Sequence, residues 1–309
     1  MTAEVTTRSR FARAGRPTDA RRRRVPHKSA IAIFVGPFGI LFLLFYLLPI
    51  AYAVWQSLLV VEREGLYGKP EQVFGGLTQY ILVFQNAPFW ESVGRMLIFG
   101  IVQVPVMLGL ALLFALLLDS PVLKGKKFFR LAFFAPYAVP GVIAAIMWGF
   151  LYSPNLSPFT QVTENIDFLS PQLVLWSIAN VVTWVYVGYN MLIIYSALLA
   201  IPQEVYEAAR LDGAGQVRIA WSIKIPMIAP ALVLTAIFSI IGTLQLLAEP
   251  QVFRSFSSAV TSTYTPNMTV YATSSILNVN LAAALSVVLA LATFALSFGF
   301  LKFSQRKAN

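Results

Sequence analysis

The most constraining feature of this sequence is a series of long apolar segments separated by short charged loops. The six segments are Ala30–Ser57, Ser92–Leu118, Leu131–Tyr152, Pro171–Leu199, Ile228–Ala248 and Leu281–Phe303. At about 1.5 Å of rise per residue, each is long enough to cross a hydrocarbon core of ~30 Å as a helix. Helices are expected because lipid offers the backbone no hydrogen-bond partners and the segments lack the alternation of barrel strands. The sequence therefore predicts an all-α integral membrane protein with six transmembrane helices.

The composition excludes several other classes. Apolar residues make up 58% of the 309 positions and charged residues 12%, against roughly 25% charged residues in soluble domains. The absence of Cys and the single His leave no thiolate or imidazole cluster, so no metal site is predicted. Gly125-Lys126 is not a phosphate-binding loop, because Ser120 replaces its first glycine and Lys127 its final Ser or Thr. The chain also lacks a catalytic constellation, so we expect no enzyme and no bound cofactor.

The positive charges orient the chain across the membrane. Of the 23 Lys and Arg residues, 19 lie before the first span, in the second and fourth loops, or at the C-terminal end. By the positive-inside rule, both termini and these two loops are cytoplasmic. Residues 1–28 are thus predicted to form a basic cytoplasmic tail and residues 29–309 the membrane domain.

The basic tail allows two other interpretations. Nucleic-acid binding is disfavoured because the tail is short and rich in Arg, Thr and Ala, whereas such binding needs a basic surface on a folded module. A secretory signal is the stronger alternative, since Ala51-Tyr52-Ala53 resembles a cleavage site. The apolar run is too long for a signal peptide and five further spans follow it, so we expect an uncleaved first span.

The predicted spans are almost free of charge. Arg95 and Glu249 lie near span ends. A charge at mid-membrane costs at least ~3 kcal/mol on insertion scales, so proton-driven carriers place charges there for function. The neutral spans disfavour such a carrier, although sodium sites built from carbonyl groups remain possible.

The fourth loop has the most informative pattern. Pro202 suits the first turn of a helix, and Val205, Ala208, Ala209 and Leu211 form an apolar stripe. Gly213 and Gly215 end this helix, and residues 216–224 can form a second one. The pattern fits either a helix–turn–helix that docks into a partner or an amphipathic loop on the bilayer.

Specific residues of this loop carry a family resemblance. Glu207-Ala208-Ala209, Gly213 and Ile223-x-Ile225-Pro226 resemble the EAA signature of permease subunits in binding-protein-dependent ABC importers. Ile225 departs from the signature, because Leu is usual before the proline. The segment Phe129–Tyr137, followed by Pro140, Trp148 and Pro154, is similar to the third span of the carbohydrate branch, which includes glycerol-3-phosphate and disaccharide permeases.

The resemblance covers about residues 90–303 and has limits. Ser157-Pro158 stands where a glycine is usual, and the loops hold no large external domain. The resemblance implies a type I ABC importer transmembrane domain in a bacterial cytoplasmic membrane. The implied partners are a second six-span permease, two cytoplasmic ATPases that bind ATP and Mg, an extracellular or lipid-anchored binding protein and a sugar; membrane lipid surrounds the spans, and no nucleic acid is involved.

In this family the EAA loop inserts into a cleft of an ATPase. The resemblance therefore implies that residues 201–228 are the coupling loop. The implied coupling residues are Glu207, Ala208, Ala209, Asp212, Gly213, Ile223 and Pro226. The alternatives are a secondary carrier of the same topology, a membrane enzyme acting on lipid-linked substrates, and an ABC permease for a solute other than a sugar. The lack of a buried cation in the spans disfavours a phosphorylated solute, although the partner permease can supply one.

Polar residues in the spans flanking this loop are candidates for the solute pathway. Thr183, Tyr186 and Asn190 share one helical face, with Tyr189 beside it, and Ser239 and Thr243 are four residues apart. Such residues often simply bind neighbouring helices. Disaccharide permeases hold sugar between these two spans, so the resemblance favours a pathway role. The predicted pathway residues are Tyr186, Tyr189, Asn190, Ser239, Thr243 and Gln245.

The loop between the last two spans is rich in hydroxyl groups, with eleven Ser or Thr in Ser255–Ser275. Its composition alone is typical of a solvated loop. In the resembled family the corresponding loops meet the two lobes of the binding protein. Tyr264, Pro266 and Asn267 are therefore predicted to take part in docking.

Overall fold

The computed structural model describes residues 27–63, 69–276 and 278–308. The chain divides into two units, residues 1–51 and residues 52–309. The predicted tail, residues 1–28, lies outside the described residues except for its last two positions. Among the described residues, five helices are long and apolar enough to cross a membrane, and a bent pair of helices makes a sixth if it counts as one span.

The described part of the first unit is helical. It contains α1 (His27–Phe42), the π-helical turn η1 (Leu43–Leu47) and the beginning of α2 (Leu48–Gln56), whose residues from Tyr52 onward belong to the second unit. The segment Ala32–Gln56 is long and apolar enough to span a membrane. Its large apolar side chains are exposed in the chain, including Phe34 and Phe45. Such exposure is expected of a helix whose solvent is lipid.

A small hairpin and a helix follow the first span. The strands β1 (Leu59–Arg63) and β2 (Pro70–Phe74) pair antiparallel, with Leu59 opposite Phe74 and Arg63 opposite Pro70. The helix α3 (Thr78–Gln85) is tied to β1 by Gln79, whose Nε2 donates to the Leu59 carbonyl oxygen at 3.1 Å. The all-α prediction was wrong for this loop, where the β-branched residues Val60, Val61 and Val73 favour paired strands.

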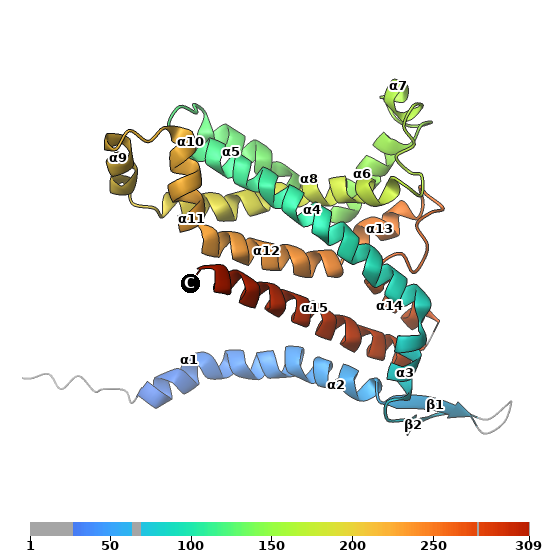
Figure 1. The fold of residues 1–309 in the computed structure, drawn as a ribbon. Helices are drawn as coiled ribbons and strands as arrows, with labels where there is room; N and C mark the ends of the chain where they lie inside the picture. The colour runs from blue at the N-terminus through green and yellow to red at the C-terminus, as the bar shows by residue number, and fades with distance from the viewer. Residues whose placement is uncertain (1–26, 64–68, 277, 309) are drawn as a thin grey trace, which may run out of the picture. The chain divides into compact units, whose positions relative to one another are not determined.

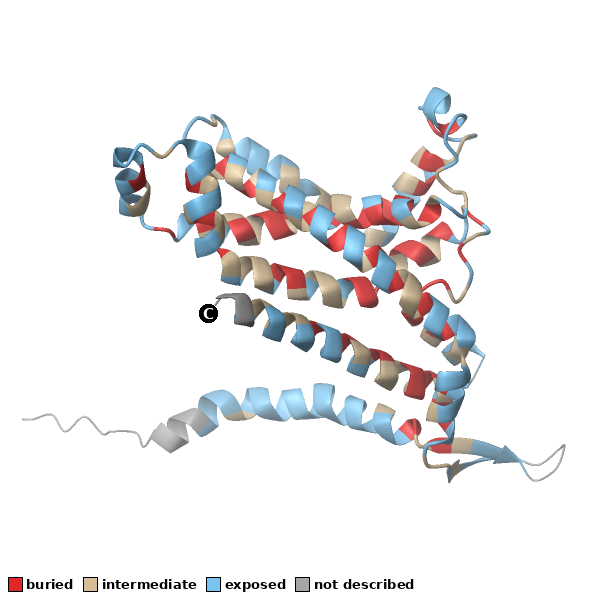
Figure 2. Cartoon of the chain, in the orientation of Figure 1, coloured by how far each residue is buried: buried red, intermediate tan, exposed pale blue. Residues whose placement is uncertain are grey.

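The second unit is built around α8 (Val174–Leu199), which packs along α4 (Ala87–Asp119). Half of the apolar window of α8 is buried, so this helix lies at the centre of the bundle. The helix α12 (Ala229–Leu244) packs against both α4 and α8, and α15 (Val279–Ala308) packs against α12 (Figures 1 and 2). The long α4 begins at Asn86, whose side-chain oxygen accepts from the Phe89 N–H at 3.0 Å.

The predicted third span is broken rather than straight. The helix α5 (Lys126–Phe134) and a 3₁₀ turn (Ala135–Ala138) meet α6 (Gly141–Tyr152) at an angle of 94°. Pro140 forces Val139 into an extended conformation and cannot donate a helical hydrogen bond. Gly188 of α8 lets α5 approach closely, since a β-carbon there would lie 2.7 Å from the Phe133 carbonyl carbon. The continuous helix predicted over Leu131–Tyr152 is therefore corrected to a bent pair.

Short elements close both ends of the bundle. They are α7 (Thr160–Thr163), α9 (Gln203–Leu211), α10 (Gln216–Ile219), the π-helical turn η3 (Ala220–Lys224), α11 (Ile225–Met227), α13 (Ala248–Phe253) and α14 (Pro266–Ser275). The fifth apolar stretch, Ala229–Phe253, is not one continuous helix either. It is interrupted after Leu244, where α12 ends, and becomes helical again at Ala248, where α13 begins.

Candidate functional site

The loop between α8 and α12 forms the helix–turn–helix that its sequence favours. Pro202 precedes α9, and Gly213 ends it in the left-handed conformation with φ +77°. The Gly213 N–H donates to the Arg210 carbonyl at 3.0 Å, and the Ala214 N–H donates to the Ala209 carbonyl at 2.9 Å. These bonds satisfy the last carbonyls of α9, and a glycine adopts the required φ without strain.

The candidate coupling residues of this loop differ in exposure. Glu207 is exposed and accepts a hydrogen bond from Gln203 Nε2 at 2.9 Å. Ala209 is buried and Ile223 is half-buried, whereas the other predicted coupling residues are exposed: Ala208, Asp212, Gly213 and Pro226. The apolar stripe divides, since Val205 is half-buried but Leu211 is 90% exposed. With Val217 and Trp221, Leu211 leaves large apolar side chains uncovered on this loop.

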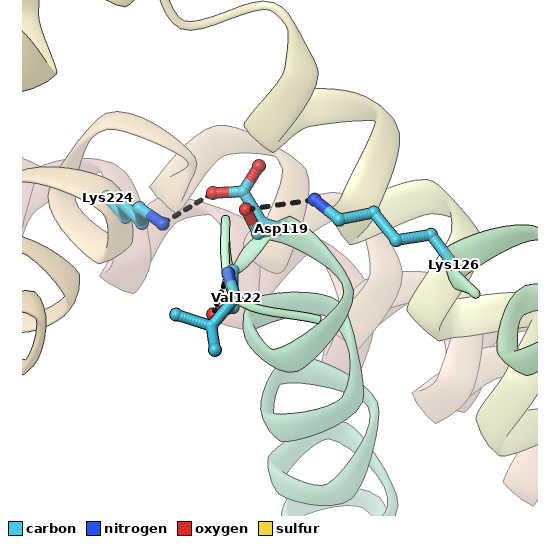
Figure 3. A network of polar contacts seen from close by, with 5 residues as sticks. Asp119, Val122, Lys126 and Lys224 are labelled. Atoms are coloured by element: carbon cyan, nitrogen blue, oxygen red, sulfur yellow. Dashed lines mark hydrogen bonds and ion pairs between the residues drawn. The ribbon is translucent and has the colours of Figure 1, made fainter. Parts of the chain in front are cut away.

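A buried ion pair joins this loop to α4. Lys224, at the end of η3, pairs with the carboxylate of Asp119, the last residue of α4; the side chain of Lys224 is 8% exposed and that of Asp119 is 12% exposed (Figure 3). Lys126 Nζ donates to the Asp119 carbonyl oxygen at 3.5 Å. The Lys224 ammonium also lies 5.1 Å from the centre of the Tyr206 ring. The end of α4, the start of α5 and the loop that precedes α12 therefore meet at Asp119.

Tyr206 belongs to the same cluster, and its hydroxyl has no hydrogen-bond partner among the described residues. Burial, and to a lesser extent the negative charge of Asp119, raise the pKa of Tyr206 to about 12. The hydroxyl thus stays protonated at neutral pH. A cavity of about 700 Å³ lies beside the ion pair, and Lys126, Tyr206 and Arg210 are among its lining residues.

The sequence analysis did not single out Asp119 or Lys224. The two residues are 105 positions apart, so no local spacing relates them. A weak signal was available, because each is a charge placed where an apolar segment meets a loop. Opposite charges at such ends can pair when the helices are neighbours.

A cavity of about 160 Å³ lies between α4, α8 and α12. Its polar lining residues are Gln103, Tyr186, Tyr189, Asn190, Ser239 and Thr243. Five of the six predicted pathway residues therefore come together around one cavity. Gln245 does not line it; this residue follows α12, is exposed, and accepts a hydrogen bond at its carbonyl oxygen from Asn267 Nδ2 at 2.7 Å.

Stacked tyrosines form part of the wall. Tyr137, in the bend of the third span, stacks on Tyr189 with 4.8 Å between ring centroids. It meets Tyr186 edge to face at 5.9 Å. Asn190 Nδ2 donates to the Tyr186 carbonyl oxygen at 3.1 Å. Flat aromatic faces combined with amides and hydroxyls can bind a solute that has both C–H surfaces and hydroxyl groups.

Gln103, on α4, was missed by the sequence analysis. It is 2% exposed, and its Nε2 donates to Thr183 Oγ1 at 3.3 Å and contacts Met107 Sδ at 3.4 Å. Its Oε1 has no partner within the part of the chain that the structure describes. A glutamine inside a long neutral span was the available signal, since polar groups there are expensive in lipid.

The predicted docking residues lie near the start of α14 and are largely covered. Tyr264 and Pro266 are buried and Asn267 is half-buried. Arg95 Nη1 donates to the Tyr264 carbonyl oxygen at 2.8 Å, and its guanidinium lies 4.4 Å from the ring centre. Burial raises the pKa of Tyr264, and Arg95 partly opposes this shift. Docking stays a prediction, with Tyr264 and Pro266 placed under the surface of the loop.

The same segment contacts the cavity wall. Thr265 Oγ1 donates to the carbonyl oxygen of Leu246, which lines the cavity, at 2.8 Å. Asn267 makes the matching contact with Gln245. The start of α14 is therefore hydrogen-bonded to the break between α12 and α13.

Comparison with known proteins agrees with this architecture. The chain is 30% identical over 210 residues to the sn-glycerol-3-phosphate transport system permease protein UgpA of Agrobacterium fabrum, covering 66% of this chain and 70% of that protein. It is 31% identical over 226 residues to the lactose transport system permease protein LacF of Rhizobium radiobacter, covering 70% and 73%.

Solved structures share the fold. A chain of a bacterial alginate ABC transporter, in complex with a periplasmic protein bound to alginate pentasaccharide, matches with a TM-score of 0.76 at 17% identity. The match covers 92% of this chain and 96% of that one. Residues 107–307 match the family described as binding-protein-dependent transport system inner membrane component. This chain belongs to that family, and is thus a membrane component of a binding-protein-dependent transport system.

Proposed function

We propose that the chain is one of two permease subunits that together form the translocation pathway of an ABC importer for a sugar. The observation that carries this proposal is the cavity on which Gln103, Asn190, Ser239 and the two tyrosines converge. The relatives named for glycerol-3-phosphate and lactose transport support a carbohydrate-type solute. This subunit is non-catalytic, and a separate ATPase binds ATP and Mg and hydrolyses the nucleotide.

The proposed topology has six spans in a bacterial cytoplasmic membrane, with both termini in the cytoplasm. The bent pair α5–α6 counts as the third span, because its two halves together are long and apolar enough to cross a membrane. The distribution of Lys and Arg supports the orientation. Residues 1–28 form the basic tail, and residues 29–309 form the membrane domain.

The proposed coupling loop is residues 201–228. Exposed Glu207 and Ala208 present a charge and a small side chain that an ATPase cleft can accept, and exposed Leu211 and Trp221 add apolar contact area. The Asp119–Lys224 pair supports transmission, since a push on the loop moves a residue bonded to the end of α4. Gly213 keeps the turn that holds the two loop helices in place.

The proposed partner on the opposite side is a solute-binding protein, extracellular or lipid-anchored. The segment that contains Tyr264, Pro266 and Asn267 supports this role by its bonds to residues 245 and 246 at the cavity wall. If the binding protein docks on the exposed part of Ser255–Ser275 and displaces it, these hydrogen bonds would transmit the movement to residues 245 and 246 at the cavity wall.

Affinity purification of the tagged full-length chain from its native membrane tests the proposal. A second six-span permease, an ATPase and a binding protein should purify with it, and the loaded binding protein should stimulate ATP hydrolysis. Solute uptake by vesicles that contain this chain alone, without ATP, would instead show a secondary carrier.

A further inference from the structure

Gln103 has an unused hydrogen-bonding group at the cavity. Its side-chain nitrogen contacts Thr183 and Met107, and its oxygen has no partner among the described residues. If the amide is turned over, the oxygen meets the Thr183 hydroxyl and the nitrogen is the atom left over. In both orientations one polar atom of a residue that is 2% exposed lacks a partner in the chain. A buried amide atom without a partner costs free energy, and a bound hydroxyl group would recover it.

The cavity has room for one ring. An apolar cavity of about 150 Å³ holds a benzene molecule, and this cavity measures about 160 Å³. None of its lining residues, all of which lie in the described part of the chain, is charged. Tyr189, which lines the cavity, is an aromatic residue that stacks on Tyr137. The volume of the cavity, its uncharged lining and its two lining tyrosines together suit one uncharged sugar ring.

Glu249 is an acidic residue buried close to the bend of the third span. Its side chain is 5% exposed, at the first turn of α13. It lies against the start of α6, since a β-carbon on Gly141 would be 2.8 Å from its Oε1. The positive end of the α6 dipole favours a carboxylate there. Arg95, near the start of α4, donates its hydrogen bond to the carbonyl oxygen of Tyr264.

We propose that Gln103 contacts the solute directly and that the cavity, which has no cationic lining residue, admits uncharged ring-shaped polyols and rejects phosphorylated or carboxylated solutes. This inference deepens the proposed function and rests on it. It separates this chain from the relative named for glycerol-3-phosphate, whose named solute carries a phosphate with a charge of about −1.5 to −2 at pH 7.

The absence of Cys from the chain allows a test that does not require the solute to be known. Gln103→Cys is placed in the whole transporter in membrane vesicles, with and without ATP. The introduced thiol is exposed to three methanethiosulfonates that carry a hydroxyethyl, a trimethylammonium-ethyl or a sulfonatoethyl group. Unmodified thiol on the tagged chain is then counted with a fluorescent maleimide, and each rate is divided by that of the same reagent with 2-mercaptoethanol.

The neutral reagent should modify the introduced thiol, and the anionic reagent should be about tenfold slower after this correction, because no charged lining residue offsets the desolvation of its sulfonate. The cationic reagent should also be slower than the neutral one, for the same reason. Val106→Cys, three residues along the same helix but facing out of the cavity and 52% exposed in the chain, is the matched control and should resist all three reagents in lipid. Should Gln103→Cys fail to assemble, Ser239→Cys, at the same cavity, should give the same pattern.

No modification by the neutral reagent, with or without ATP, would overturn the assignment of Gln103 to the solute path. Equal corrected rates for the neutral and anionic reagents would overturn the charge selection. Stimulation of ATP hydrolysis by the binding protein is measured on the unsubstituted transporter in the same vesicles. Its absence, together with the predicted thiol pattern, would reject the proposed importer while leaving the cavity's selectivity in place.

Discussion

The proposed coupling loop and the proposed solute cavity differ in how their polar groups are paired. At the loop, α4 ends in a largely covered carboxylate that is paired with Lys224. Deeper in the bundle, the same helix presents Gln103, a neutral side chain with an unpaired atom. At the loop, two opposite charges are thus paired with each other, whereas at the cavity an uncharged side chain has an unpaired atom. A contact that transmits movement needs a fixed geometry, and a solute pathway needs polar groups that can exchange hydrogen-bond partners.

The largest effect is expected at the ion pair. Lys224→Met leaves Asp119 buried without its partner, which for buried pairs costs about 3–5 kcal/mol. The apparent melting temperature of the purified permease should therefore fall sharply. The matched control is Lys224→Met combined with Asp119→Leu, which removes both charges and should recover most of the loss. If the single variant melts like the unsubstituted protein, the pair does not hold the loop.

The next effect concerns the turn of the loop. Gly213→Pro cannot adopt φ +77°, because the proline ring fixes φ near about −65°. Partner assembly should survive, and stimulation of ATP hydrolysis by the binding protein should be lost. Glu207→Ala combined with Ala208→Trp should have the same effect by blocking the contact rather than the turn. Normal stimulation in both variants would reject the coupling role.

A smaller effect is expected at the cavity wall. Tyr189→Ala removes the stack on Tyr137, and such pairs contribute about 0.5–1.5 kcal/mol. Uptake should fall up to about tenfold, since 1.4 kcal/mol corresponds to that factor, with partner assembly retained. Tyr189→Phe keeps the ring and should stay near normal. A variant that instead loses expression or assembly would point to helix packing.

The smallest effect is expected at Tyr206. Tyr206→Phe removes a hydroxyl that has no partner among the described residues, so stability at neutral pH should be unchanged or slightly higher. The raised pKa has a defined sign. Between pH 10 and about 12 the unfolded chain releases the tyrosine proton and the folded chain retains it, so stability falls with rising pH. The melting temperature, measured at several pH values across this range, should decrease more steeply with pH for the unsubstituted protein than for Tyr206→Phe.

Local periodicity predicted those parts of the site that lie on one helix. Tyr186 and Asn190 are four residues apart, as are Ser239 and Thr243, so each pair shares a face without any tertiary information. Gln103 was missed because it stands alone on a third helix, where no second polar residue marks the face. Gln245 was placed in the pathway by the same spacing rule, but α12 ends before it.

Long-range relations were beyond the sequence for a different reason. The pairing of Asp119 with Lys224 depends on how α4 and the coupling loop approach each other, and 105 positions separate the two residues. The bend in the third span had a local cause, Pro140, that apolarity alone conceals. The spans could be predicted because few backbone conformations satisfy their own hydrogen bonds in lipid. Their bends could not, because each bend depends on particular residues.

We propose that the loop and the cavity perform separate steps of one ATP-driven cycle. The direct measurement is made on the complete transporter in proteoliposomes, with the native binding protein carrying its own solute, and follows uptake and ATP hydrolysis together. Asn190→Ala, at the cavity, should reduce or alter uptake while hydrolysis stays stimulated; Gly213→Pro, at the loop, should lose both. If Asn190→Ala instead transports normally, or if Gly213→Pro retains stimulated hydrolysis, the division of roles between the two regions is wrong.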